Sequence, residues 1–432
     1  MTLTTTRRFL LASTAFGGLA LFASAAFAAD TELTFLVDNT TSTVKMAQAL
    51  ADAFMAKNPG IKITVDSRPG GGEGDNIVKT KLATGDMADV FLYNAGSLFQ
   101  AINPEKNLVD LTAEPFEANI IPSFKTVVTT NGKIYGAPIQ TAMGGGVLYN
   151  KKVYADLGLK VPLTWADFMK NNAAIKAKGG IAPVIQTFKD TWTSQLFVLG
   201  DFYNVLKAVP NFPADYTGNK AKYASTPAAL KSFQRQEDVF KAGDLNADFG
   251  SATLDDGLKM LASGKGAHYP MLTFAISNIR DNDPAHLKDI GFFALPGDDA
   301  AANGLTVWMP PGVYIPKASK HVDEAKKFVN FIASVEACDI QTKAVGASGP
   351  YLVKGCKLPA DVPPAVADLV TYFNTDGQTA PALEYLSPIK GPSLEQITVE
   401  VGSGLRPAAD AAALYDLDVK KQAQQLGLPE WK

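Results

Sequence analysis

Between residues 32 and 102, short apolar runs alternate with amphipathic stretches. Residues 32–37 and 89–93 have the composition of buried strands, and residues 61–65 alternate in the manner of a third strand. Residues 43–55 carry apolar side chains at helical spacing and stop at Asn58-Pro59-Gly60. Residues 75–82 suit a second helix, which follows a flexible loop at Gly70–Gly74. Strands that alternate with helices predict a parallel sheet covered on both faces.

The remaining chain is richer in helix and equally globular in composition. Helices are predicted over residues 165–178, 226–242, 254–262 and 323–334, and buried strands over 291–295 and 312–315. A length of 432 residues predicts two or three domains, or one unit with two lobes. Because the chain has no internal repeat and no long linker, the lobes are expected to share a close interface.

Charge and residue counts exclude several classes of function. With 40 basic and 43 acidic residues, the net charge is −3, which argues against a nucleic-acid partner. Three histidines and two cysteines are too few for a zinc site built from several such ligands, and an iron–sulfur cluster held by four cysteines of this chain is excluded. We therefore expect neither a metal nor a cofactor.

Signatures of catalysis were sought and none is present. The sequence has no Gly-x-Ser-x-Gly elbow, no Walker loop and no His-Glu-x-x-His motif. The glycine cluster at residues 70–74 has Asp75 where a dinucleotide-binding loop needs its third glycine. A glycosidase that assembles two carboxylates from distant positions stays open as an alternative.

Residues 1–28 have the pattern of a cleaved export signal. Arg7 and Arg8 precede an apolar stretch over residues 9–22, and Ala26-Phe27-Ala28 forms a small-x-small cleavage site. A membrane anchor is the alternative, but the apolar run is short and ends at the cleavage pattern. The arginine pair also fits a twin-arginine signal, so the export route stays open. The sequence predicts a protein exported from the cytoplasm and cleaved after Ala28.

Export changes the expectation for Cys338 and Cys356. Two cysteines close in sequence are expected to form a disulfide in an oxidising compartment, with two buried thiols as the alternative. Such a bond would close a short loop and contribute about 3 kcal/mol through chain entropy.

Seven short segments together resemble the sugar-binding proteins of bacterial ABC importers, which are extracellular solute-binding proteins of family 1. They follow the order and spacing of that family, and the glucose- and maltose-binding branches are the most similar. The segments are Gly85-Asp86-Met87-Ala88-Asp89-Val90, Ile134-Tyr135-Gly136-Ala137-Pro138, Leu148-Tyr149-Asn150-Lys151-Lys152, Pro162-Leu163-Thr164-Trp165-Ala166-Asp167-Phe168, Ser263-Gly264-Lys265-Gly266-Ala267, Phe293-Ala294-Leu295-Pro296-Gly297 and Ile315-Pro316-Lys317-Ala318-Ser319-Lys320.

The resemblance implies an α/β periplasmic binding protein fold with two lobes and a hinge, each lobe a mainly parallel sheet flanked by helices. It places residues 29–139 plus 315–349 in lobe 1 and residues 140–314 plus 350–432 in lobe 2. The chain would cross the hinge near residues 138–141, 311–315 and 349–353. In this layout the two cysteines lie on either side of the third crossing.

A sugar presents apolar C–H faces and a rim of hydroxyls, so it is bound by aromatic rings beside planar polar groups. The resemblance points to Trp192 as a stacking platform beside Asp190, and to Phe274 at a stacking position of the maltose branch. Trp308 precedes a hinge crossing, and Lys390 matches a basic position of the glucose branch. For Trp192, Phe274 and Trp308 a place in the core is the alternative. Further candidates stand at strand ends or in the glycine loop: Asp38, Asn39, Glu73, Tyr93 and Asn94.

The implied function is the capture of a mono- or small oligosaccharide in the periplasm by hinge closure. The closed monomer would then deliver the sugar to an ABC permease in the membrane, without catalysis. The same fold with another solute, such as glycerol 3-phosphate, a polyamine or ferric ion, is the first alternative. An exported carbohydrate-active enzyme is the second. The sugar and its length stay open.

Overall fold

The apolar run at residues 32–37 forms an inner strand of a five-stranded sheet. In the computed structural model, which describes residues 30–432, β1 (Thr31–Asp38) pairs in parallel with β2 (Ile61–Arg68) and β3 (Val90–Tyr93). β12 (Gly312–Tyr314) lies between β3 and β6 (Gly136–Pro138) and is antiparallel to both. The strand order is β2-β1-β3-β12-β6, so β12 alone runs against the direction of the other strands.

Helices from distant parts of the chain cover this sheet and complete the first lobe. α1 (Thr41–Lys57) buries Met46, Leu50 and Phe54, which are spaced four residues apart and therefore share one face. The ring of Phe328 from α14 (Val322–Ile332) lies 5.4 Å from that of Phe35 on β1. The other helices of this lobe are α2 (Gly71–Thr84), α3 (Ser97–Ala101), α4 (Pro104–Asn107), α5 (Pro122–Val127) and α15 (Val335–Val345).

The second lobe is built on a six-stranded sheet around one long strand. β7 (Met143–Asn150) is antiparallel to β9 (Gly266–Leu272), β10 (Ile290–Ala294) and β11 (Leu305–Trp308). β8 (Ala182–Val184) runs parallel to β9, and β13 (Thr379–Pro381) runs parallel to β11. Five strands therefore share one direction, and β7 alone is reversed.

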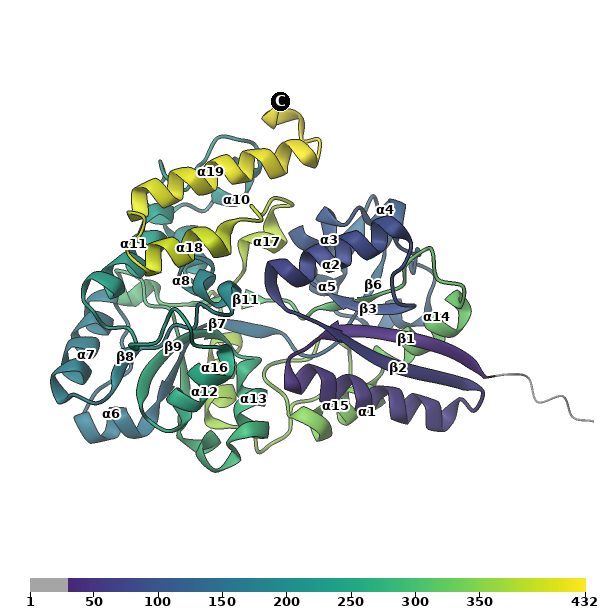
Figure 1. Cartoon of the computed structure of the whole chain (residues 1–432), viewed down its shortest axis with the longest axis horizontal. Coiled ribbons are helices and arrows are strands. Elements are labelled where there is room, and N and C mark those ends of the chain that lie inside the picture. Colours follow the sequence, from purple (N-terminus) through teal and green to yellow (C-terminus); the bar gives the residue numbers. More distant parts are fainter. Residues whose placement is uncertain (1–29) are drawn as a thin grey trace, which may run out of the picture.

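Helices surround this second sheet, and the last two helices form a layer above it (Figure 1). Thr164 caps the start of α7, because its hydroxyl oxygen accepts a hydrogen bond from the Asp167 amide (3.2 Å). The helices are α6 (Lys151–Leu157), α7 (Trp165–Lys178), α8 (Leu196–Gly200), α9 (Phe202–Ala208), α10 (Phe212–Thr217), α11 (Pro227–Lys241), α12 (Leu254–Ala262), α13 (Ala275–Asn282), α16 (Pro364–Phe373), α17 (Leu383–Leu386), α18 (Leu394–Gly402) and α19 (Ala408–Gln425).

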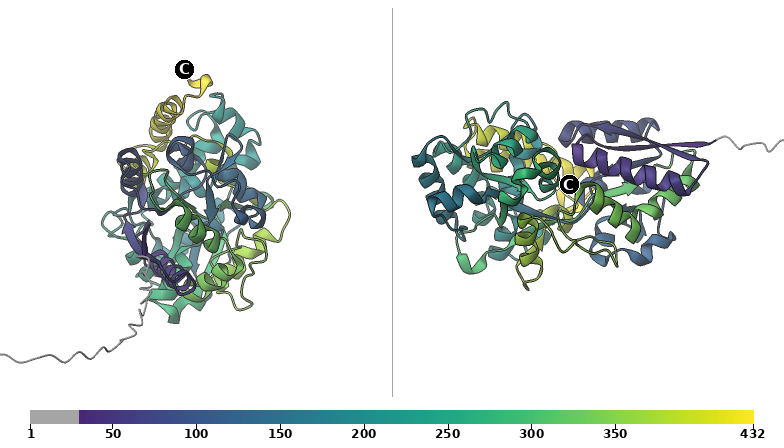
Figure 2. Two further views of the ribbon diagram at one scale, coloured as in Figure 1. Left: turned by 90° about the vertical axis from the view of Figure 1, so that its right-hand side faces the viewer. Right: turned by 90° about the horizontal axis from the view of Figure 1, so that it is seen from below.

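The predicted α/β fold with two lobes is confirmed, and Figure 2 shows the lobes lying side by side. In each sheet most strands share one direction, as predicted, and a single strand is reversed. The reversed strand has the same origin in each case. β7 follows β6 across the first crossing, and β12 follows β11 across the second, so each is the strand by which the chain enters a lobe from the other one.

The position of β12 also bears on the predicted domain boundaries. A boundary at residue 314 would give β12 to the second lobe, although its hydrogen bonds lie in the first sheet. Residues 352–354 still bond to the first lobe, since the Ile121 amide donates to the Leu352 carbonyl (2.9 Å) and the Lys354 amide to the Asn119 carbonyl (2.7 Å). We therefore propose boundaries in the β6–β7 connection, in the β11–β12 connection, and between Cys356 and α16.

The predicted disulfide between Cys338 and Cys356 is confirmed. Cys338 lies on α15, and the bond ties the segment that leads to the third crossing onto this helix. The predicted leader at residues 1–28 lies outside the described residues. Within residues 30–432, no helix has the length and apolar character needed to span a bilayer.

Candidate functional site

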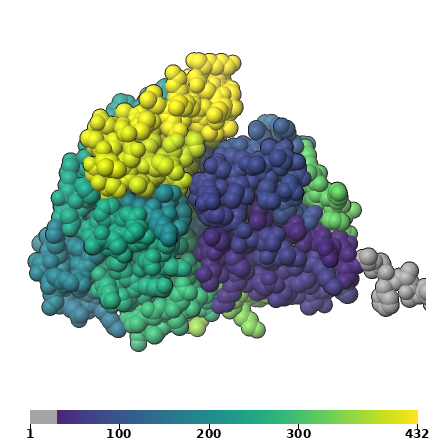
Figure 3. Space-filling model, in the orientation of Figure 1, coloured from purple at the N-terminus to yellow at the C-terminus, as the bar shows by residue number. Residues whose placement is uncertain are grey.

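A cavity of about 670 Å³ lies between the two lobes, where strands of both sheets end. Its lining includes Asp38 at the end of β1, Asn94 just after β3, Leu272 at the end of β9 and Trp308 at the end of β11. In the space-filling view the purple and blue first lobe abuts the teal and yellow second lobe along this line (Figure 3). The crevice outside the carboxyl ends of strands is the usual ligand position in such sheets, and the volume is within the range of ligand pockets.

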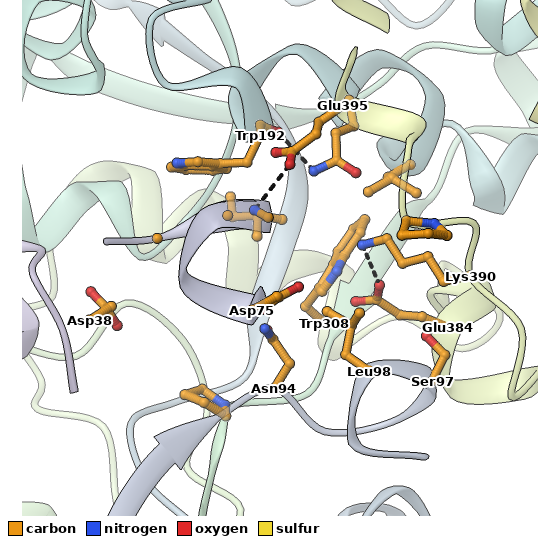
Figure 4. A pocket seen from close by; sticks show the side chains of 18 of the residues that line it. Asp38, Asp75, Asn94, Ser97, Leu98, Trp192, Trp308, Glu384, Lys390 and Glu395 are labelled. Carbon is orange, nitrogen blue, oxygen red and sulfur yellow. Dashed lines mark hydrogen bonds and ion pairs between the residues drawn. The ribbon is translucent and has the colours of Figure 1, made fainter. Parts of the chain in front are cut away.

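Trp308 forms an aromatic platform in the middle of the cavity (Figure 4). Its side chain is only 5% exposed and packs against Met143. A Cβ added at Gly145 would lie 2.1 Å from Cζ3 of the indole, so only glycine lets the ring approach β7 this closely. Gly145 in β7 therefore determines how closely the Trp308 ring lies against this strand.

Trp192 provides a second aromatic surface at the upper edge of the cavity. It stands in the short 3-10 turn Thr191–Gln195, and its ring lies 5.9 Å from that of Phe274. From the first lobe, Gly71 approaches so closely that a Cβ there would lie 3.3 Å from the Trp192 side chain. Trp192 thus belongs to the second lobe but contacts the first.

Asp75 brings a carboxylate from the first lobe into the cavity, beside Asn94 and facing Trp308 (Figure 4). Burial raises the pKa of Asp75 above its ordinary value, while the charges of Lys390 and Arg68 act in the opposite direction. Arg68 is itself buried and donates to the carbonyl oxygens of Pro69 (2.9 Å) and Leu92 (3.4 Å). Its guanidinium is therefore already engaged by the backbone.

The second lobe contributes an ion pair on the other side of Trp308. Lys390 donates to Glu384 at 3.0 Å, and the two side chains are 14% and 10% exposed. Paired charges of this kind present both a donor and acceptors at fixed positions. Together with Asp75 and Asn94, they surround the Trp308 platform with polar groups from both lobes.

Glu395 on α18 links the lobes at the start of α2. One carboxylate oxygen accepts from the Gly72 amide (3.0 Å), and the other accepts from the Thr191 hydroxyl (3.1 Å). Gly70, at the N-cap of α2, offers no side chain to bond the first free amides of that helix. A carboxylate of the second lobe therefore caps a helix of the first, where the helix dipole also favours negative charge.

This contact corrects the prediction of a flexible loop at residues 70–74, because α2 begins at Gly71. Glycine is a poor helix former, so the local sequence favours a loop. Packing against Trp192 and capping by Glu395 override that preference. Neither partner is near in sequence, which is why the sequence alone indicates a loop.

Seven of the ten predicted site residues line the cavity. They are Asp38, Glu73, Asn94, Trp192, Phe274, Trp308 and Lys390. Sequence reasoning missed several further polar residues of the lining. They are Asp75, Gln195, Glu384, Glu395 and Gln396. Asp75 could have been found, since it follows the glycine cluster directly. The other four stand on turns and helices whose orientation no sequence pattern reveals.

Tyr93, Asp190 and Asn39 do not line this cavity. Tyr93 is fully buried because side chains alternate along β3, so that Leu92 and Asn94 face the cavity and Tyr93 faces the core. The Asp190 carboxylate accepts a hydrogen bond from the Leu254 amide (2.6 Å) at the start of α12. Asn39 is exposed, and it lines a smaller neighbouring cavity together with Asp190.

Among residues 30–432, no group of three or more His, Cys, Asp or Glu side chains is arranged to hold a metal ion. The lining of the cavity is instead suited to an organic ligand with apolar faces and many hydroxyl or amine groups. Aromatic rings suit such faces, and carboxylates, amides and two lysines, Lys79 and Lys390, suit the polar edges.

Known proteins share both the sequence pattern and the fold. The family model of the bacterial extracellular solute-binding proteins matches residues 38–337. The multiple sugar-binding protein of Streptococcus mutans is 28% identical over 314 residues, which is 70% of this chain and 71% of that protein. A chitin oligosaccharide binding protein superposes with a TM-score of 0.80 at 21% identity over 91% of this chain and 99% of the other. The raffinose complex of the solute-binding protein RafE superposes with a TM-score of 0.74 at 22% identity, over 92% and 99%.

The match of the family model covers both lobes, from the end of β1 to the first turn of α15, and the solved structures share the fold. The predicted resemblance is therefore confirmed. This chain belongs to the family of bacterial extracellular solute-binding proteins.

Proposed function

We propose that this protein is the sugar-binding component of an ABC importer. The observation that carries the proposal is the Trp308 platform, which is set between polar groups of both lobes. An aromatic ring suits the apolar face of a pyranose, and the surrounding carboxylates and amides suit its hydroxyls. The names of the relatives support the same ligand class, because they describe proteins that bind multiple sugars, chitin oligosaccharides and raffinose.

Capture proceeds by closure of the two lobes over the sugar. Asp75 and Asn94 belong to the first lobe, whereas Trp308 and the Glu384–Lys390 pair belong to the second, so a sugar gains its full set of contacts only when the lobes meet. A ligand shifts a conformational equilibrium only by the contacts that differ between the two states. The closed form is then recognised by the permease in the membrane.

The protein acts in the periplasm as a monomer after cleavage behind Ala28, and it performs no catalysis. The export pattern at residues 1–28 supports this location. The relatives named above are binding proteins, which supports a role without turnover.

A polyamine is a second candidate ligand because the cavity has an excess of acidic groups. Asp38, Glu73, Asp75, Glu384 and Glu395 outnumber the basic residues of the lining, which are Arg68, Lys79 and Lys390. A phosphate ester such as glycerol 3-phosphate is less suited, since Arg68 is engaged by backbone carbonyls.

Titration of the mature protein with a panel of ligands tests the proposal. Tryptophan fluorescence and melting temperature are followed against mono- and oligosaccharides, glycerol 3-phosphate and spermidine. We expect a saturating change with one class of sugar. A response to spermidine alone would replace the sugar with a polyamine, and a response to the phosphate ester alone would reject both candidates.

A further inference from the structure

A second cavity of about 350 Å³ adjoins the first one at Trp192. It lies between the start of α1 in the first lobe and the start of α12 in the second, and Asn39, Lys189, Asp190 and Asp255 contribute to its lining. We refer to it as the side cavity.

Only a thin partition separates the side cavity from the central one. Thr40, Gly70, Gly72, Glu73 and Trp192 line both cavities. The Trp192 side chain lies against the glycine backbone at residues 70–71, so part of this partition is one indole in contact with glycines. The central cavity and the side cavity therefore adjoin along Trp192.

Four polar side chains of the side cavity have no partner within the protein. Among residues 30–432, the side chains of Asn39, Glu73, Lys189 and Asp255 form no hydrogen bond or ion pair with another residue. Other polar side chains of the lining are already engaged: Asp190 by the Leu254 amide, Thr191 by Glu395, Thr253 by Asp256 and Asn278 by Ser42. Donors and acceptors gathered in a concave surface beside an indole suit a ligand rich in hydroxyl groups.

We propose that the side cavity binds a further sugar unit of an oligosaccharide whose first unit lies on Trp308. This inference rests on the proposed function and adds the length of the ligand to it. Trp192, shared by the two cavities, contacts the sugar chain where it passes from one to the other. Asn39 and Asp255 bind the hydroxyls of the outer unit.

Calorimetric titration with sugars of increasing length tests this inference. The series runs from a monosaccharide to a tetrasaccharide of the class that binds, against the wild type and the double variant Asn39→Ala/Asp255→Asn. Neither side chain is buried in the core, so the variant is expected to fold, and its melting temperature verifies this. Exposed residues outside both cavities give the matched control, Asn282→Ala/Asp376→Asn.

We expect the wild type to bind longer sugars more tightly than the monosaccharide. The double variant should lose about tenfold in affinity for the longer sugars, since one hydrogen-bonding amide is removed and one charged acceptor becomes a neutral amide, and keep its affinity for the monosaccharide. Lys189→Ala offers an independent check with the same pattern. Affinity that does not depend on sugar length would overturn the proposed role of the side cavity, and so would an equal loss of affinity at every length. Either result would leave the proposed sugar-binding function intact. Failure to bind any sugar would overturn the proposed function itself.

Discussion

At the scale of single residues, the site depends on which residues contact each functional side chain. Trp308 can lie against β7 because position 145 is a glycine, and the Arg68 guanidinium is oriented by the two carbonyl oxygens to which it donates. Sequence reasoning identified Trp308, Trp192 and Lys390 as candidates but could not predict these partners. The partners come from distant strands, and contacts of that kind leave no local pattern.

Replacing Trp308 with leucine tests the platform. Leucine keeps the position apolar but removes the aromatic face, so we expect the affinity for sugar to fall at least about tenfold. Trp165→Leu is the matched control, since Trp165 packs on Phe168 outside the cavity. Calorimetric titration measures both variants. Unchanged sugar affinity in Trp308→Leu would show that this ring does not contribute to binding.

Asp75→Asn tests the buried carboxylate in the absence of ligand. Because burial raises the pKa of Asp75, folding favours its protonated form, and ionisation lowers stability as the pH rises from the ordinary value of 3.8 through the raised pKa. The variant should therefore melt at a higher temperature than the wild type at neutral pH, with a smaller difference near pH 4. The same change should weaken sugar binding.

Thermal melts between pH 4 and pH 7, with Asp66→Asn as an exposed control, follow the difference. A variant that is less stable than the wild type at neutral pH would show that the carboxylate stabilises the free protein, contrary to this argument.

At the scale of elements, α2 shows where sequence-based prediction succeeded and where it stopped. The helix was predicted over residues 75–82, and Gly85 ends it in a left-handed conformation. Its first turn was not predicted because the residues that stabilise it are distant in sequence. Glu395 and Trp192 both lie more than a hundred residues later in the chain. β1 and β3 were predicted well because their apolar runs are buried, whereas the three-residue β6 was not predicted.

Glu395→Ala tests the capping of α2 across the lobes. Removal of the carboxylate leaves the Gly72 amide without its acceptor and weakens the contact between lobes, so sugar affinity should fall by about five- to tenfold. Glu395→Gln keeps a neutral acceptor and should lose less. Glu400→Ala on the same helix is the control, because Glu400 pairs with Arg406 away from the cavity.

Small-angle scattering with and without sugar, beside calorimetry, separates the possible causes. We expect Glu395→Ala to need more sugar to reach the compact form. Equal affinities in all three variants would mean that this contact does not contribute to closure.

At the scale of the whole molecule, the lobes are joined by neighbouring segments of the chain. Thr141 in the first crossing forms a bridge with Tyr351 near the third, and the disulfide holds that third segment on α15. The family resemblance predicts crossings near residues 138–141, 311–315 and 349–353, whereas the boundaries that we propose put the third crossing after Cys356. It did not predict that β12 belongs to the first sheet, because a three-residue strand has too little pattern to indicate its partner.

The double variant Cys338→Ser/Cys356→Ser tests the contribution of the disulfide. Both cysteines lie on the side of the first lobe, so we expect lower stability by about 3 kcal/mol with sugar affinity nearly unchanged. Denaturant unfolding measures the first quantity and calorimetry the second. A loss of affinity as large as the loss of stability would instead assign the bond a part in hinge motion.

The reversed strand β12 determines when the first sheet can be completed during synthesis of the chain. β12 lies between β3 and β6 and joins them, so a slot stays open in this sheet until residues 312–314 have been synthesised. By that time most of the second lobe has already emerged. A fragment that ends near residue 139 would expose two unpaired strand edges and is expected to aggregate. The completion of the first lobe thus depends on the chain returning to it after most of the second lobe has been made.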